Sequence, residues 1–221
     1  MRINKFVALA TGLSRRAADT AIGEQRVAIN GDPAQLGSEA TPHDTVTLDG
    51  KTIELPAQTT TVLLNKPVGF VVSREGQGSQ TVYDLLPSDL SGLKPVGRLD
   101  KDSSGLLLLT NDGDLANKLT HPSQQKRKVY EVSLDKPLQP LHRQIIAERG
   151  IQLADGPSQL GLERQADGND HDWIVTMYEG RNRQIRRTFD ALGYTVKRLH
   201  RTTFGEYHLG DVPKGTYREL A

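Results

Sequence analysis

Residues 97–110 read GRLDKDSSGLLLLT, a charged turn followed by the most apolar stretch of the chain. The four leucines at 106–109 predict a buried strand, since a short apolar run bounded by turn residues is typical of strands inside a core. Arg98, Asp100 and Asp102 precede that strand within five positions. Burying a charge is costly unless a partner of opposite sign lies beside it. We therefore expect at least one of these carboxylates to occupy a partly dry site next to a cation.

Two simpler interpretations of this turn exist. Asp100, Asp102, Ser104 and Gly105 match the opening of a calcium-binding EF-hand loop, but the twelfth position is Asn111 instead of a bidentate Glu. The intervening leucines cannot ligate a hard cation, so calcium is excluded. The aspartates could also merely cap turns, as they do in most Asp-rich turns.

The rest of residues 62–221 alternates between strand and helix patterns. Hairpin-like connections and longer returns favour an α+β fold, in which helices pack on a mixed, largely antiparallel sheet. Strands are expected at 62–67, 69–73, 105–110, 129–134, 172–179 and 194–204, and helices at 115–121, 141–150 and 182–193.

The first 55 residues show a different pattern of predicted elements, two helices followed by short hairpins. Apolar residues at helical spacing predict a helix over 2–10 that Gly12 ends, and Ser14 is placed to cap a second helix over 15–25. The sequence VAINGD and the Asp49-Gly50 pair predict two tight hairpins. A polar linker follows at 56–61, so we expect two domains, 1–56 and 57–221.

Composition excludes several classes of protein. The 221 residues include no cysteine, which excludes disulfides, thiolate catalysis and cysteine-based metal sites. No apolar stretch approaches the ~20 residues that span a membrane, and no signal peptide is apparent, so a cytoplasmic location is expected. Net charge is only +1, but residues 180–201 hold seven basic residues and one acidic residue. Such segregated charge favours an anionic partner.

The second chemically informative segment is EGRNRQIRRTFDALG at 179–193. Arg181 and Arg183 precede the expected helix, and Arg186 and Arg187 lie in its first turns. Cations at a helix N-terminus oppose the helix dipole, so an anion or a protein carboxylate is expected to hold them there. A basic surface patch without a specific partner is the alternative.

Two further basic segments lie elsewhere. In KRKVYEV, Arg127 and Lys128 lead into a strand that carries Tyr130, a residue that in isolation would be assigned to a half-buried core. The segment from Arg2 to Gly31 resembles the S4 RNA-binding domain, with a basic first helix, S-R-R-x-A, a turn and V-x-I-N-G, although Gln25 stands where such domains usually have glycine. The resemblance implies RNA contacts from its exposed cations, namely Arg2, Lys5, Arg15 and Arg16.

Together these segments resemble the RsuA family of bacterial ribosomal-RNA pseudouridine synthases over nearly the whole chain. The motifs LLNKPVGFVVS, GRLDKDSSGLLLLT, KVYEV and EGRNRQIRR occur in the family's order. By this resemblance Asp100 is the catalytic aspartate, Tyr130 the active-site tyrosine and Arg186 the cation paired with the aspartate. Arg98 is the arginine associated with displacing the target base from its stack.

The resemblance implies an isomerisation that requires no metal or other cofactor. Asp100 would attack C1′ of the ribose or remove a ribose proton to form a glycal, and the residues do not separate these routes. Phosphate contacts would come from Arg127, Lys128, Arg181 and Arg183. The implied partner is ribosomal RNA, with a 23S stem-loop slightly favoured over 16S, free or in an assembling subunit, and the protein is expected to act as a monomer. The alternatives are a non-catalytic RNA-binding or ribosome-assembly factor of the same fold, or an unrelated anion-binding enzyme.

Overall fold

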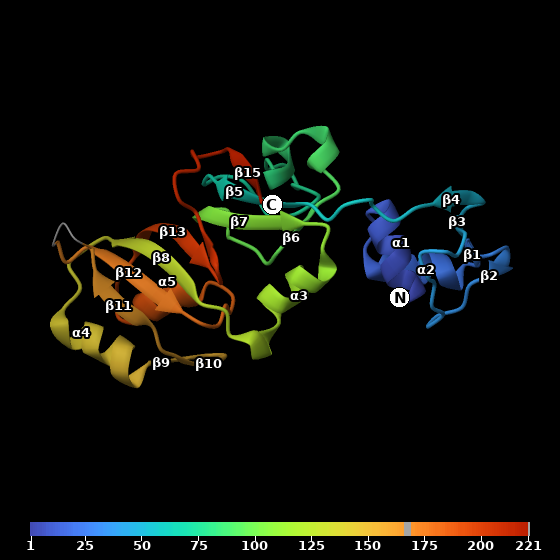
Figure 1. Cartoon of the computed structure of the whole chain (residues 1–221). Coiled ribbons are helices and arrows are strands. Elements are labelled where there is room, and N and C mark those ends of the chain that lie inside the picture. Colours follow the sequence, from blue (N-terminus) through green and yellow to red (C-terminus); the bar gives the residue numbers. More distant parts are fainter. Residues whose placement is uncertain (166–168, 221) are drawn as a thin grey trace. The chain divides into compact units, whose positions relative to one another are not determined.

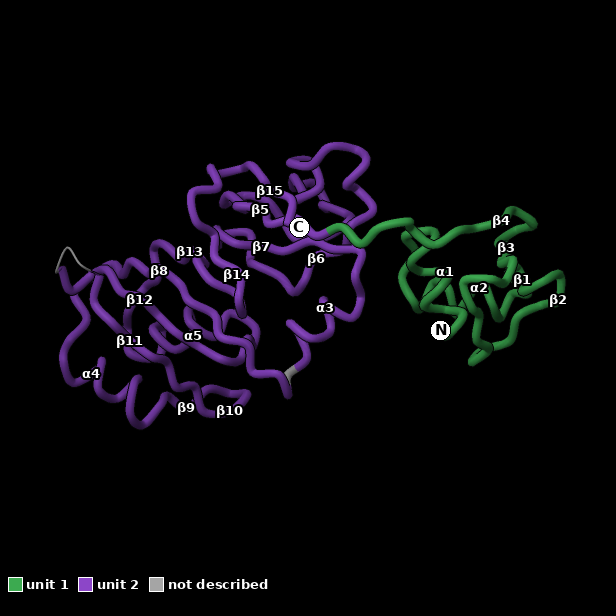
Figure 2. The backbone as a smooth tube through the Cα atoms, in the orientation of Figure 1, with its two compact units in different colours: residues 1–60 green, residues 61–221 purple. Residues whose placement is uncertain are grey.

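The chain divides into two compact units, Met1–Thr60 and Thr61–Ala221, shown in different colours in Figure 2. The computed structural model describes residues 1–165 and 169–220. Within that part of the chain, no helix has the length and apolar character needed to cross a membrane.

Unit 1 packs two helices against a small sheet (Figure 1). Helix α1 (Ile3–Thr11) ends at Gly12, whose φ is 78°, and helix α2 (Arg15–Gly23) begins after Ser14, whose Oγ accepts a hydrogen bond from the Ala17 amide at 3.0 Å. Both predicted helices are therefore confirmed. The sheet has the order β2–β1–β3–β4, with β1 Val27–Ile29, β2 Asp32–Pro33, β3 Val46–Leu48 and β4 Lys51–Ile53.

The turns of unit 1 follow from its short turn motifs. Asp49 and Gly50 both have positive φ, 51° and 75°, as the predicted two-residue hairpin requires. Gln25 also has a positive φ of 57°, so this residue adopts the backbone conformation that favours glycine. One apolar cluster closes the unit, including Ile3, Phe6, Ile22 and Val46.

Unit 2 is built on one large sheet with the order β11–β12–β8–β13–β7–β5–β15. Its pairs are antiparallel except β13–β7, which pairs in parallel only over His200↔Ser104 and Arg201↔Gly105. The α+β prediction is confirmed. The strand bounds are β5 Thr61–Lys66, β7 Ser104–Thr110, β8 Lys128–Leu134, β11 Gly161–Arg164, β12 Asp172–Met177, β13 Val196–Phe204 and β15 Tyr217–Leu220, with β6 Lys94–Pro95 and β14 Tyr207–His208 pairing at the side of β7 and β13.

Short helices and a separate hairpin surround this sheet. The helices are α3 Gly113–Thr120, α4 Pro140–Gln144 with a π-helical turn Ile145–Arg149, and α5 Gln184–Asp190, together with single turns at Val82–Leu85, Ser88–Leu90 and Pro122–Gln124. The hairpin pairs β9 Ile151–Leu153 with β10 Gly156–Ser158. Helix α5 is shorter than the helix predicted over 182–193.

The leucine run is buried on both faces of the sheet. Leu107 and Leu109 belong to one apolar cluster, and Leu106 and Leu108 to another on the opposite face. The strand predicted at 105–110 is thus confirmed as β7. This double burial fixes the position of the charged turn that precedes it.

The predicted strand at 69–73 is wrong. Val71 forms only an isolated bridge with Thr81, and Gly69, with φ 94°, donates its amide to the Lys101 carbonyl at 2.7 Å. The backbone of this segment bonds to the charged turn instead of entering a sheet. The segment therefore supports the turn at 97–103.

Candidate functional site

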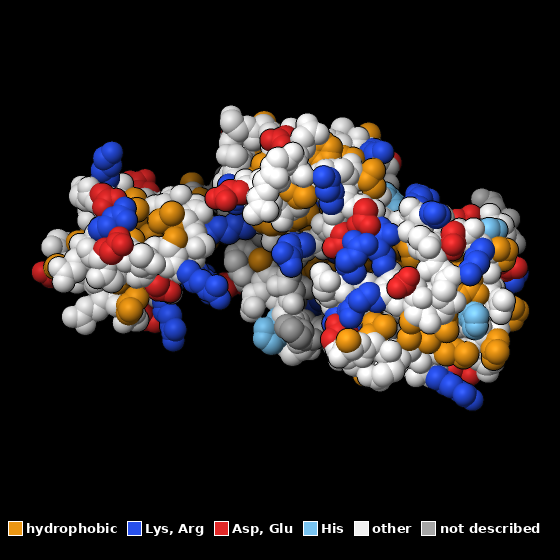
Figure 3. Space-filling view, turned by 180° about the vertical axis from the view of Figure 1, so that it is seen from behind, with side chains coloured by type: hydrophobic (Ala, Val, Ile, Leu, Met, Phe, Trp, Pro, Cys, Tyr) orange, Lys and Arg blue, Asp and Glu red, His pale blue; other side chains and the backbone are white. Residues whose placement is uncertain are grey.

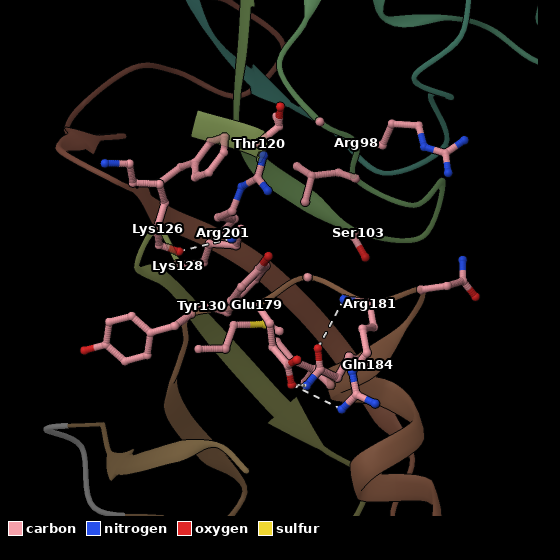
Figure 4. Close-up of a pocket in the computed structure, with 18 of the residues that line it drawn as sticks. Arg98, Ser103, Thr120, Lys126, Lys128, Tyr130, Glu179, Arg181, Gln184 and Arg201 are labelled. Atoms are coloured by element: carbon pink, nitrogen blue, oxygen red, sulfur yellow. Dashed lines mark hydrogen bonds and ion pairs between the residues drawn. The ribbon is translucent and has the colours of Figure 1, made fainter. Parts of the chain in front are cut away.

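A cavity of about 610 Å³ opens in unit 2 where the β13 and β7 halves of the sheet meet. The charged turn contributes Arg98, Asp100 and Ser103, and the floor carries side chains of β8 and β13 (Figure 4). The segment 177–185, from the end of β12 to the start of α5, forms a further wall. Four segments that are distant in sequence therefore meet at one hollow. The space-filling view shows acidic and basic side chains grouped on one face of the larger unit (Figure 3).

The charged turn rests on a buried lysine. Lys66, at the end of β5, is fully buried, and its Nζ donates to the carbonyls of Asp100 at 3.0 Å and Ser103 at 2.7 Å, as well as to that of Pro67 at 3.0 Å. Burial lowers the pKa of Lys66 to about 8, although the carboxylates of Asp100 and Asp102 oppose that shift. The ammonium thus fixes the backbone from which the Asp100 side chain enters the cavity.

Arg183 contacts both carboxylates of the turn. Its Nη1 donates to Asp100 Oδ2 at 3.4 Å and to Asp102 Oδ1 at 3.0 Å, and its Nη2 donates to Asp102 Oδ2 at 3.1 Å. The hydrogen bonds from Arg183 hold the pKa of Asp102 below its ordinary value. Arg183 has a φ of 47°, an uncommon backbone conformation for this residue type that occurs at functional sites.

The resemblance pairs Arg186 with Asp100, whereas the guanidinium within hydrogen-bonding distance of Asp100 in the structure is that of Arg183. Arg186 Nε lies 3.3 Å from Asp102 Oδ2, and its Nη2 and Nη1 donate at 2.8 Å to the carbonyls of Asp102 and Val196. Arg183 precedes helix α5 with a left-handed backbone conformation, whereas Arg186 lies within the helix. Burial lowers the pKa of Arg186, while the negative charges of Asp102 and Asp100 oppose that shift.

The remaining arginines of this segment meet protein carboxylates. Arg181 donates to Asp155 at 2.8 Å and to Glu179 at 3.1 Å, and Arg187 donates to both oxygens of Asp155 at 2.9 and 2.7 Å. Glu179 also accepts a hydrogen bond from the buried Gln184. We expected either a bound anion or a protein carboxylate beside the cations at this helix start. The structure shows protein carboxylates as their partners.

Tyr130 and Arg98 both line the cavity. Tyr130, on β8, is 7% exposed, and Arg98 is an exposed residue of the charged turn. The Asp100 side chain is 34% exposed, so it is partly sheltered yet open to a ligand. Asp100, Tyr130 and Arg98 therefore share one cavity, as a common site requires.

The other basic residues lie in different places. Lys128 and Arg181 line the cavity, whereas Arg127 is next to Lys128 in sequence and is not among the lining residues. The four cations expected to contact RNA from the N-terminal segment all belong to unit 1, in α1, in α2 or next to α1: Arg2, Lys5, Arg15 and Arg16.

Sequence reasoning missed three residues of the site. Lys66 could have been noticed, because a lysine at the end of an apolar strand stands out in VLLNK. Arg201 lies in a strand that the sequence predicts, but its residue type gave no indication of a role. Its side chain is almost fully buried and lines the cavity. Tyr178, 56% exposed, presents an aromatic ring at the cavity wall. Across residues 1–165 and 169–220, no three His, Asp or Glu side chains gather as a possible metal site.

Comparison with known proteins points to one family. A family model described as RNA pseudouridylate synthase matches residues 60–191. An "Uncharacterized RNA pseudouridine synthase" of Aquifex aeolicus is 37% identical over 100% of this chain and 90% of the relative. The "Dual-specificity RNA pseudouridine synthase RluF" of Escherichia coli is 36% identical over 100% of this chain and 75% of the relative.

Another relative is longer, and one solved structure is similar throughout. "Ribosomal large subunit pseudouridine synthase B" of Xylella fastidiosa is 39% identical over 92% of this chain but only 45% of the relative, so the chain spans less than half the length of that protein. A crystal structure of a pseudouridylate synthase superposes with a TM-score of 0.71 and 33% identity, covering 100% of this chain and 96% of the other.

Proposed function

Because the chain belongs to the RNA pseudouridylate synthase family, we propose that it converts specific uridines of ribosomal RNA to pseudouridine. The observation that carries this proposal is the placement of Asp100 in a sheltered cavity beside Arg183, with Tyr130 and Arg98 on the same walls. The similarity to a ribosomal large subunit pseudouridine synthase favours large-subunit RNA, and we propose a stem-loop of 23S rRNA as the substrate. Such a substrate implies action in the cytoplasm, where ribosomes assemble.

The reaction needs one carboxylate next to the ribose. The bond between C1′ and N1 of uracil breaks, the base rotates, and C5 bonds to C1′, while the proton lost from C5 balances the one gained at N1. Asp100 either attacks C1′ or removes a ribose proton to give a glycal. In both routes Asp100 acts as an anion, and the guanidinium of Arg183 at 3.4 Å stabilises that charge.

The other cavity residues have supporting roles in this proposal. The ring of Tyr130 packs against the uracil and assists removal of the C5 proton. Arg98 fills the space left when the uridine turns out of its stack, a movement that costs a few kcal/mol. Arg186 stabilises the turn through the backbone of Asp102 instead of pairing with Asp100.

We further propose that two domains, 1–56 and 57–221, have different roles, RNA binding and catalysis respectively. The first would act as an S4-like RNA-binding domain, because its exposed Arg15 and Arg16 stand at the start of one helix. A basic face of this kind binds phosphates and increases affinity by tethering. Unit 2 would carry the isomerisation, and the chain would act as a monomer.

Mapping of pseudouridine in ribosomal RNA tests the proposal. Cells that lack the protein should lose pseudouridine at one or a few positions, and the wild-type chain should restore them. Asp100→Asn should not restore them, with turnover at least about 10²-fold lower in vitro. Asp89→Asn, which changes an exposed aspartate on a single helical turn outside the cavity, is the matched control.

The same experiment separates an enzyme from a binding protein. If ribosomal RNA from the deletion strain keeps every pseudouridine while its subunits assemble slowly, the chain is a non-catalytic assembly factor. Asp100→Asn should still bind RNA as the wild type does. Full turnover by Asp100→Asn would refute the proposed role of this carboxylate.

A further inference from the structure

Arg201 is a buried cation whose hydrogen bonding is incomplete. It lies on β13, is 3% exposed and lines the cavity. Its Nε donates to the Leu106 carbonyl at 2.8 Å, but its buried Nη2 has no hydrogen-bond partner within the described part of the chain. A buried donor left without an acceptor costs about 1–3 kcal/mol. A ligand that supplies an acceptor would remove this cost.

Lys128 is a second cation in the same part of the cavity. It begins β8, lines the cavity, and its Nζ donates to the Lys126 carbonyl at 3.1 Å. Burial lowers the pKa of Lys128 to about 8, and the positive charge of Arg201 contributes to that shift. The carboxylate that opposes this shift, Glu179, already accepts hydrogen bonds from Arg181 and Gln184.

The two cations lie over one aromatic ring. The Lys128 Nζ is 5.3 Å and the Arg201 Cζ is 4.8 Å from the centroid of Phe204. The ring offers each cation a favourable contact of about 0.5–2 kcal/mol, but it brings no negative charge to neutralise them. Figure 4 shows both side chains on the cavity floor, where they rise from the paired strands β8 and β13.

Lys128 and Arg201 differ from the other cations near the cavity in the partners that they contact. Arg181, Arg183 and Arg186 each contact a protein carboxylate. For Lys128 and Arg201 the structure gives backbone carbonyls and an aromatic ring as partners. Two like charges in a partly dry site disfavour each other, and a bound anion removes that repulsion.

We propose that Lys128 and Arg201 form an anion subsite that receives a backbone phosphate adjoining the uridine in the cavity. The assignment of the anion to RNA rests on the proposed function, whereas the existence of the subsite does not. A nucleotide needs a carboxylate and cations in one cavity, because its ribose must contact Asp100 and its phosphate must contact positive charges. A charged hydrogen bond from Arg201 would satisfy its free donor.

Small probes test the subsite without requiring catalysis. Uridine 5′-monophosphate and inorganic phosphate should raise the pKa of Lys128, followed by NMR of 13C-labelled lysine, because a bound anion favours the ammonium. Lys66 is the internal control: its pKa is also about 8, but it is not among the residues that line the cavity, so it should not respond. Uridine should leave Lys128 unchanged. An equal response to uridine would show that the pair binds the nucleoside and would overturn the proposal.

Variants of the full chain test the subsite with RNA. Binding of a 23S stem-loop should weaken at least tenfold in Lys128→Gln, and the slope of log K against log salt should fall by about 0.7–0.9. Lys197→Gln removes an exposed charge from the same strand as Arg201 but outside the cavity, and its slope should match the wild type. Unchanged affinity and slope in Lys128→Gln would also refute the subsite.

Arg201→Lys is the second variant, because it keeps the charge but loses the forked donor geometry. It should lose affinity for uridine 5′-monophosphate and keep that for uridine, with folding checked by near-UV circular dichroism. If it does not fold, Lys128→Gln alone decides the outcome. A wild-type chain that binds the monophosphate at this pair yet makes no pseudouridine would refute the proposed function and leave the subsite intact.

Discussion

The ammonium of Lys66 lies 3.0 Å from the main-chain carbonyl oxygen of Asp100, across 34 positions of the chain. A second carbonyl of the same turn, that of Ser103, accepts from the same nitrogen at 2.7 Å. Lys66 therefore holds the backbone of the turn that carries Asp100, and Arg183 contacts the Asp100 carboxylate itself.

Replacing Lys66 should change the pH dependence of stability. Burial lowers the pKa of Lys66 to about 8 from an ordinary 10.5, so between these values the unfolded chain keeps a proton that the folded chain has lost. The free energy of unfolding of the wild type should therefore rise with pH relative to Lys66→Met, by up to about 1.4 kcal/mol per pH unit across that interval. Urea unfolding measures this difference, with the exposed Lys197→Met as control. A flat difference would contradict it.

Substitutions of the two arginines near the turn should have different effects, Arg183→Gln on turnover and Arg186→Gln on the free energy of unfolding. Arg183→Gln removes the contact with Asp100 from a side chain that is 43% exposed, so turnover should fall at least about tenfold with little loss of stability. Arg186→Gln leaves the carbonyls of Asp102 and Val196 without their donor, which should lower the free energy of unfolding by about 2 kcal/mol. Single-turnover assays and urea titrations compare them. The reverse order of effects would restore Arg186 as the partner of Asp100.

Adding one methyl group at Gly105 should destabilise unit 2. A Cβ there would lie 2.2 Å from the Arg201 carbonyl oxygen and 2.6 Å from its amide nitrogen, and the φ of 101° is itself unfavourable for alanine. Gly105→Ala should lose at least about 2 kcal/mol, measured by thermal or urea unfolding. Gly92→Ala is the control, because a Cβ added there would meet no atom within 4 Å and its φ is not in the left-handed region. Equal stability of the two variants would argue against close approach of β7 and β13.

The basic face of unit 1 should contribute to the salt dependence of RNA binding. Arg15 and Arg16 are exposed at the start of α2, so Arg15→Gln combined with Arg16→Gln should reduce the slope of log K against log salt by about 1.4–1.8. Arg26→Gln is the control, since Arg26 is already paired with Asp49 at 2.7 Å. Binding is measured by fluorescence anisotropy of a labelled ribosomal-RNA stem-loop. A double variant with the wild-type slope would exclude RNA contact at this face.

Local signals in the sequence were sufficient for much of the fold. The cap at Ser14, the hairpin at Asp49-Gly50 and the leucine strand β7 are each indicated by a short run of adjacent residues. The segment at 69–73 did not form a strand, because the hydrogen bond from Gly69 to the Lys101 carbonyl connects positions that periodicity does not relate.

The details of the site depended on contacts between distant residues. Arg183 and Arg186 are chemically identical and three positions apart, so residue type does not tell which of them contacts Asp100. The burial of Lys66 depends on carbonyls 34 and 37 positions away. Sequence could therefore indicate which segments make up the site but could not assign their pairs.

The parallel contact between β13 and β7 also constrains when the cavity can exist during protein synthesis. The turn that carries Asp100 is made about a hundred residues before Arg201, and the two sides of the cavity come together only when β13 docks at Gly105. A nascent chain that stops ahead of Arg183 has the carboxylate but neither Arg183 nor Arg201. Premature release from translation thus yields a polypeptide that holds no assembled centre, so truncated products should form no pseudouridine even where unit 1 is complete.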